Sequence, residues 1–217
     1  MVANIIVLAG SLAGFILGII LFMNPNKPLF AKMITLAIGC VAYGRCFQIV
    51  RMLTSAKVTT EFQLGFLGVI GSLIFLFSVN FGLLDKTVDD KSKKNRAYRL
   101  IPIAAPLAAL VLYLVFLGFA DTNALTKIVG AALTFFAVQS SYFNLKHLIF
   151  PDKNGGVLSG LRVYNLLALV YSFLCIFEMI ALSRGNLAIN LVISVVMGIV
   201  VFLMIPTAIK GVKRWNN

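Results

Sequence analysis

The sequence predicts an all-α membrane protein, a single bundle of seven transmembrane helices over residues 1–217, with the N-terminus outside and the C-terminus in the cytoplasm. Hydrophobic residues make up 60% of the chain, and mean hydropathy is +0.99. Soluble domains contain only about 45–50% apolar residues. Apolar stretches of about 20 residues, long enough to cross a bilayer, recur along the chain. They are continuous rather than alternating, which excludes a transmembrane β-barrel.

Seven segments meet this length requirement, and short polar connectors join them. The expected spans are 4–23, 30–53, 62–84, 100–120, 124–146, 157–182 and 187–209. The first span lacks the basic flank of a cleaved signal peptide, so we expect it to be retained as a helix. No soluble domain of ordinary size fits between the spans.

Small residues in the first span predict how it packs. Gly10, Gly14 and Gly18 recur four residues apart, so they share one helix face and allow another backbone to come close. Packing within the bundle is the simplest interpretation, and a homodimer through this face is the alternative. In the fourth span, Pro106 is expected to kink the helix.

The distribution of basic residues predicts the orientation. Fourteen of the 19 Lys and Arg residues lie on one set of connectors and the C-terminal tail. The positive-inside rule places that set in the cytoplasm. The net charge of +12 therefore reflects topology, and we expect no nucleic-acid partner. The connector between the third and fourth spans is the longest polar stretch. Its Lys91, Lys93, Lys94 and Arg96 could bind anionic lipids or a cytoplasmic protein.

The short run "GCVAYGRCFQIVRM" places Arg45 inside the second span. Arg45 lies about 22 Å along the helix from its cytoplasmic start, at 1.5 Å per residue. Glu178 lies at a similar outer depth in the sixth span. Either charge buried alone costs several kcal/mol, so the two are expected to pair.

Other polar groups lie at the same depth and could extend the pair into a network. The candidate ligand-binding residues are Arg45, Gln48, Glu61, Tyr171 and Glu178. Two interpretations stay open: these groups line an outward-facing pocket for a small polar ligand, or they only lock the helices together.

A second set of polar residues lies toward the cytoplasmic side of the spans. This inner polar cluster comprises Asn80, Gln139, Ser141, Asn144, Tyr164 and Asn165. Such groups form hydrogen bonds between helices, each contributing about 0.6–2 kcal/mol. They could instead line a transport path.

The residue inventory argues against an enzyme. Catalysis in a membrane needs nucleophiles, metal ligands or paired carboxylates close together. The single histidine, His147, falls at the cytoplasmic end of the fifth span and is expected at the interface. The three cysteines form no CxxC motif and no Cys/His cluster, so no metal site or cofactor is expected. The last span has no central lysine, which argues against a retinal protein.

The stretch from Leu29 to Asp85 resembles the second and third helices of the seven-helix membrane sensor domains that precede bacterial histidine kinases. The shared pattern is an apolar helix, a short polar outer loop and a Gly-rich helix ending in aromatic residues. The resemblance implies a sensor in the cytoplasmic membrane of a bacterium. Because no kinase domain follows Asn217, it also implies output through a separate partner.

The expected function is therefore receptor-like sensing of a small ligand in an outward-facing polar pocket. One alternative is a small-solute transporter with an alternating-access path through the bundle. Another is a non-catalytic subunit of a larger membrane complex.

Overall fold

The structure, a computed structural model, describes residues 1–54, 65–88, 95–119, 124–151 and 156–215. Within these ranges the chain is helical and contains no strand. Four of the predicted functional positions, Glu61, Lys91, Lys93 and Lys94, lie outside the described residues.

In the described part of the chain, seven stretches of helix are long and apolar enough to cross a membrane, which confirms the predicted all-α, seven-helix architecture. The elements are α1 (Val2–Phe22), α2 (Leu29–Thr54), α3 (Gly65–Val79), the π-helical turn η1 (Asn80–Leu84), the 3-10 turn η2 (Asp85–Thr87), α4 (Arg96–Leu100), the 3-10 turn η4 (Ile101–Ile103), α5 (Ala104–Phe119), α6 (Ala124–Ile149), α7 (Val157–Ser183) and α8 (Leu187–Trp215).

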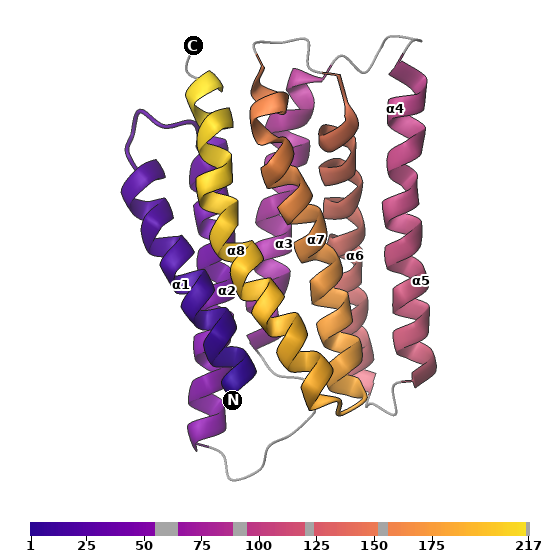
Figure 1. Cartoon of the computed structure of the whole chain (residues 1–217). Coiled ribbons are helices and arrows are strands. Elements are labelled where there is room, and N and C mark those ends of the chain that lie inside the picture. Colours follow the sequence, from indigo (N-terminus) through magenta and orange to yellow (C-terminus); the bar gives the residue numbers. More distant parts are fainter. Residues whose placement is uncertain (55–64, 89–94, 120–123, 152–155, 216–217) are drawn as a thin grey trace.

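The helices stand side by side, with the two termini at opposite ends of the bundle (Figure 1). Six of them close a ring, in which neighbours in contact are α1–α2, α2–α3, α3–α6, α6–α7, α7–α8 and α8–α1. Helix α5 packs outside this ring against α6 and α7. The arrangement leaves α1, α2, α7 and α8 adjacent at the end that carries the N-terminus.

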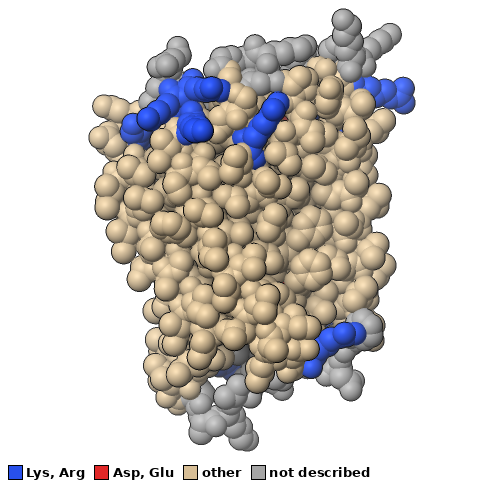
Figure 2. Space-filling model, in the orientation of Figure 1, with Lys and Arg blue, Asp and Glu red and all other residues tan. Residues whose placement is uncertain are grey.

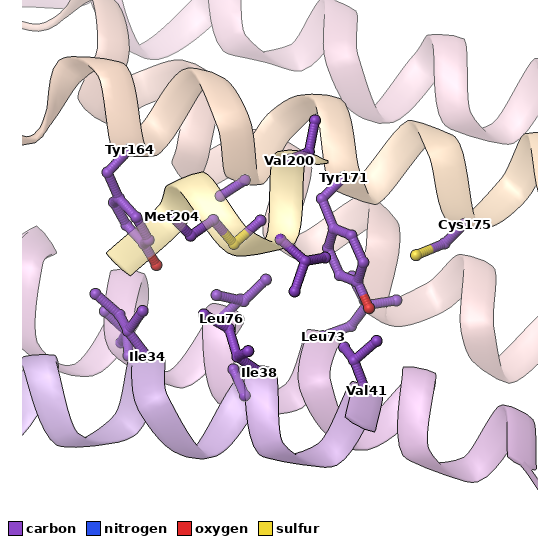
Figure 3. Close-up of a cluster of buried hydrophobic side chains, with 14 of the residues drawn as sticks. Ile34, Ile38, Val41, Leu73, Leu76, Tyr164, Tyr171, Cys175, Val200 and Met204 are labelled. Carbon is purple, nitrogen blue, oxygen red and sulfur yellow. The ribbon is translucent and has the colours of Figure 1, made fainter. Parts of the chain in front are cut away.

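The centre of the ring is apolar. Ile38, Leu76 and Met204, from α2, α3 and α8, are fully or almost fully buried and meet in one layer (Figure 3). The side chains of Tyr164 and Tyr171, two turns apart on α7, lie on either side of this layer (Figure 3). This layer separates the polar groups at one end of the bundle from those at the other.

Glycines allow the closest helix contacts. A Cβ at Gly10 would overlap the carbonyl oxygen of Gly198 in α8, and one at Gly18 would overlap Thr35 in α2. Gly14 also faces α8. The glycine row of α1 is thus occupied within the chain, as the simpler interpretation predicted. A homodimer through Gly10, Gly14 and Gly18 would require this packing to open.

The fourth span is broken close to the predicted position. The 3-10 turn at Ile101–Ile103 precedes α5, one helical turn before Pro106. Pro106 has no N–H to donate to the carbonyl of Pro102, and its ring crowds that carbonyl. The irregularity therefore appears on the N-terminal side of the proline.

Charged side chains gather at the two ends and leave an uncharged belt between them on the face that Figure 2 shows. Most of the Lys and Arg visible there lie at the end that carries the C-terminus. This belt is what a protein surrounded by lipid requires.

Candidate functional site

The candidate site is built around Arg45, whose guanidinium contacts four helices. Its Nη1 donates to Asn4 Oδ1 of α1 and to Gln48 Oε1 of α2, both at 3.1 Å. Its Nη2 donates to Glu178 Oε2 of α7 at 2.5 Å and contacts Met197 Sδ of α8 at 3.3 Å. These five residues are referred to below as the Arg45 cluster.

The predicted pairing of Arg45 with Glu178 is confirmed, and so is the contact between Arg45 and Gln48. Arg45 and Glu178 are each only 1% exposed. At that burial the two charges satisfy each other with little help from water, and charge-assisted bonds of this kind are about twice as strong as neutral ones. The site is closed in this structure.

Sequence reasoning missed two members of the Arg45 cluster, Asn4 and Met197. Asn4 lies in the first turn of α1, where a polar side chain at the membrane interface is common. Met197 is an apolar residue in an apolar span. Neither has a distinguishing pattern in the sequence, because their roles depend on α1 and α8 packing against α2.

Three buried polar atoms on α2 and α8 have no hydrogen-bond partner among the described residues: Arg45 Nε, Asn190 Oδ1 and Ser194 Oγ. Asn190, Ser194 and Met197 follow one another at spacings of four and three, so they share one face of α8. That face reaches Arg45 through Met197. The unsatisfied groups of Asn190 and Ser194 therefore lie on the face of α8 that contacts the guanidinium through Met197. Buried polar atoms without partners are rare in folded proteins.

Tyr171, another predicted site residue, does not hydrogen-bond to the Arg45 cluster. Its hydroxyl lies 2.6 Å from Ser72 Oγ of α3. The narrow space beside these two side chains, lined also by Val41 and Leu76, leaves no room for a water molecule.

The inner polar cluster is partly confirmed. Asn80 Nδ2 donates to Asn144 Oδ1 at 2.8 Å, which joins η1 to α6. Asn144 Nδ2 donates to Ser140 Oγ at 3.0 Å, and Ser172 Oγ of α7 donates to the same oxygen at 3.2 Å. Ser140 and Ser172 were not among the predicted members.

The other predicted members do not join this network. Ser141 donates to the carbonyl of Val138 in its own helix, and Gln139 is half-buried without a hydrogen bond in the described part of the chain. Tyr164 and Asn165 are fully buried, and their side-chain polar atoms have no partner among the described residues.

His147 extends the network and corrects the expectation of an interfacial histidine. Its ring is 0% exposed. Nδ1 lies 3.3 Å from Asn80 Oδ1, and Nε2 lies 3.3 Å from Asp85 Oδ1. Lys146 Nζ donates to the same carboxylate oxygen at 2.7 Å, and Lys146 is also buried. Lys146 is thus an ion-pair partner rather than a solvated topogenic charge.

Asp85 lies just after the third span and is the outermost residue of this network, with 23% of its side chain exposed. Burial alone would raise the pKa of its carboxyl. Hydrogen bonds from His147 and Lys146, together with their positive charge, outweigh burial, so the pKa of Asp85 lies below its ordinary value. Asp85 is therefore ionised at neutral pH.

The described residues contain no group of three or more His, Cys, Asp or Glu side chains that could hold a metal ion. No protein-family model, curated protein or solved structure matches this chain.

Proposed function

We propose that this chain is a membrane sensor that binds a small polar ligand beside Arg45, at the end of the bundle that we place outside the cell. The observation that supports it most is the guanidinium itself. It joins α1, α2, α7 and α8 through its contacts, yet its Nε–H has no acceptor among the described residues. A buried donor without a partner costs about 1–3 kcal/mol, and a ligand that supplies an acceptor recovers that energy.

The chemistry of the unsatisfied atoms suggests the kind of ligand. Arg45 Nε–H needs an acceptor, Asn190 Oδ1 needs a donor, and the Ser194 hydroxyl can serve as either. A compact molecule with both donor and acceptor groups fits this set. One with an anionic group would also compete with Glu178 for Arg45.

Ligand binding beside Arg45 would displace the helix ends on the opposite side of the membrane. Helix α8 runs without interruption from Leu187 to Trp215, where Lys210, Lys213 and Arg214 lie. Arg214 Nη1 donates to the carbonyl oxygen of Gly156 at 2.7 Å, so α8 is tied there to the start of α7. A shift between α7 and α8 at Arg45 would therefore move their basic ends. We propose that these ends and the connector after α3 contact a cytoplasmic partner or anionic lipids.

The test is a ligand screen by thermal unfolding of the purified full-length chain in nanodiscs. A ligand at 100 times its dissociation constant stabilises the native state by about 2.7 kcal/mol. We expect at least one small polar compound to raise the melting temperature of the wild type and of a Lys32→Gln control, which removes a charge at the far end of α2. Arg45→Gln should lose that response.

Gln48→Leu serves as a second test variant, because it removes a neutral neighbour and leaves the ion pair in place. It should weaken the response. An undiminished response in both Arg45→Gln and Gln48→Leu would overturn the proposed site.

A small-solute transporter is the second candidate, and one observation favours it. Polar networks lie at both ends of the bundle, around Arg45 and around Asn80, with the apolar layer of Ile38, Leu76 and Met204 between them (Figure 3). A transport cycle would have to open that layer. Counterflow in proteoliposomes that tracks the ligand found in the thermal screen would favour transport over sensing. Co-purification with a cytoplasmic kinase or ATPase would instead favour a sensor or a subunit of a complex.

A further inference from the structure

His147 has an oxygen atom opposite each of its ring nitrogens. Asn80 Oδ1 lies 3.3 Å from Nδ1, and Asp85 Oδ1 lies 3.3 Å from Nε2. Asp85 is ionised and can only accept, so Nε2 carries a proton. Whether Nδ1 also carries one depends on which end of the Asn80 amide faces it.

The amide of Asn80 belongs to a longer chain of hydrogen bonds. Asn80 donates to Asn144, and Asn144 donates to Ser140. The oxygen of Ser140 also accepts a hydrogen bond from the hydroxyl of Ser172. The chain from His147 to Ser140 covers seven residues of α6, about 10 Å along the helix axis. Beyond Ser140 it ends at Ser172, a buried serine of α7.

The π-helical turn η1 gives this chain its geometry. It begins at Asn80 and is followed directly by Asp85, so the wider turn brings both side chains to α6. Short π-helical turns are uncommon and occur often at functional sites. Here the turn places one amide and one carboxylate on either side of a single imidazole.

Two hydrogen-bond arrangements satisfy the same atom positions. In the first, a doubly protonated His147 donates from Nδ1 to Asn80 Oδ1, Asn80 donates to Asn144, and Asn144 donates to Ser140. In the second, both amides are turned over: Ser140 donates to Asn144, Asn144 to Asn80, and Asn80 to the bare Nδ1 of a neutral His147. An amide can donate from one end and accept at the other, so both arrangements keep every hydrogen bond from His147 through Asn80 and Asn144 to Ser140.

We propose that His147 is a proton-binding site open to the cytoplasmic face through Asp85, and that its protonation reverses the direction of the hydrogen bonds through Asn80 and Asn144 to Ser140. The protein then has an input from cytoplasmic pH that does not depend on the Arg45 cluster. The added proton resides on Nδ1 of the imidazole, opposite Asn80, while Nε2, opposite Asp85, is protonated in both forms.

The charges around His147 are compatible with both forms. Asp85 carries one negative charge, and Lys146, on the same carboxylate oxygen, carries one positive charge. Among the described residues, the other titratable groups on the elements that contact this end of α6 are Lys86 of η2, Arg96, Tyr98 and Arg99 of α4, and Arg162 and Tyr164 of α7. The sequences of α3, η1, η4 and α5 contain no charged residue. The Asp85–Lys146–His147 group thus alternates between neutral and singly positive.

The reversal of the hydrogen bonds would be transmitted along α7 toward the Arg45 cluster. Ser172 follows Tyr171, whose hydroxyl lies 2.6 Å from Ser72, and Glu178 of the Arg45 cluster is two turns further along α7. The Ser172 hydroxyl has two acceptors within reach, Ser140 Oγ at 3.2 Å and the carbonyl oxygen of Ala168 in α7 at 2.9 Å, so its single proton can shift between them when Ser140 changes from acceptor to donor. Both proposed inputs therefore act on α7.

The experiment uses the fact that the chain contains a single histidine. Full-length protein is labelled with ¹⁵N at histidine and at asparagine side chains, reconstituted in nanodiscs, and followed by NMR from about pH 5 to about pH 9. We expect Nε2 to stay protonated at every pH and Nδ1 to gain a proton as pH falls. The side-chain amide signals of Asn80 and Asn144 should shift with the same midpoint.

Two variants make the measurement specific. In His147→Gln, which has no titratable ring, the amide signals of Asn80 and Asn144 should no longer respond to pH. In Asn165→Leu, which removes an equally buried amide outside this chain of hydrogen bonds, the response should persist. An imidazole that keeps one protonation state over the whole pH range would overturn the proposal. So would a titrating His147 that leaves both amide signals unmoved.

Discussion

The ion pair between Arg45 and Glu178 can be tested without knowing any ligand. Both residues are 1% exposed, so replacing one of them leaves the other charge buried without its partner. Breaking a buried pair in this way costs about 3–5 kcal/mol. Arg45→Met and Glu178→Met should each lower the free energy of unfolding by that amount.

The double variant, with Arg45 and Glu178 both replaced by Met, should be far less destabilised than the two single effects added together. No buried charge remains in it, and apolar replacements of a buried pair are often neutral or stabilising. Some destabilisation should remain, because the side-chain amide oxygens of Asn4 and Gln48 lose their donor. Each lost donor costs about 1–3 kcal/mol. The coupling between the two substitutions should therefore be about 4 kcal/mol.

The assay is equilibrium unfolding of the purified protein in mixed micelles, followed by far-UV circular dichroism. Lys32→Met combined with Glu178→Met provides the control, because Lys32 lies about 20 Å along α2 from Arg45 and its effect should simply add. If Arg45→Met and Glu178→Met were also additive, the pair would make no net contribution, and the reasoning about this site would fail.

Three further outcomes are expected from the structure. Gly10→Ala should lower stability by about 1–3 kcal/mol, because the new Cβ overlaps the backbone of Gly198, whereas Gly118→Ala, with open space around it, should be tolerated; thermal unfolding distinguishes them. Asp85 has a lowered pKa in the folded protein, so it stabilises the fold above the ordinary aspartate value of about 3.9 and loses that effect as pH falls. The stability gap between wild type and Asp85→Asn should therefore narrow below about pH 4, and a gap unchanged by acid would contradict this. A fluorescent protein fused to the C-terminus should fold and emit, while one fused to the N-terminus should stay dark; the reverse pattern would refute the proposed orientation.

The sequence was sufficient for the helices and for one pair of contacts. Spans are set by hydrophobic length, which is why their bounds agree with the described helices to within about six residues, the largest difference being at the end of α8; the expected bounds at 62 and 120 lie outside the described residues. Arg45 and Glu178 could be paired because each is an isolated charge at a matching depth in its span. Depth, however, does not reveal rotation about a helix axis. Tyr171 lies at a suitable depth and yet faces Ser72.

The His147 network escaped prediction for a different reason. Asp85 and Lys146 lie at the ends of their spans, where charges are normally solvated, so their residue types alone do not indicate an ion pair. Their common membrane side was a usable signal, because two opposite charges at the same depth on neighbouring helices tend to pair. The π-helical turn at Asn80 has no sequence signature, and it decides which side chains of that segment reach α6.

The most direct test of the central claim is an experimental density map of the full chain in nanodiscs, recorded with and without the compound selected by the thermal screen. We predict the Arg45 guanidinium in contact with the Glu178 carboxylate in the free protein, and new density against Arg45 Nε and Ser194 when the compound is present. A guanidinium turned toward lipid, or a compound bound away from α2 and α8, would contradict the proposed site.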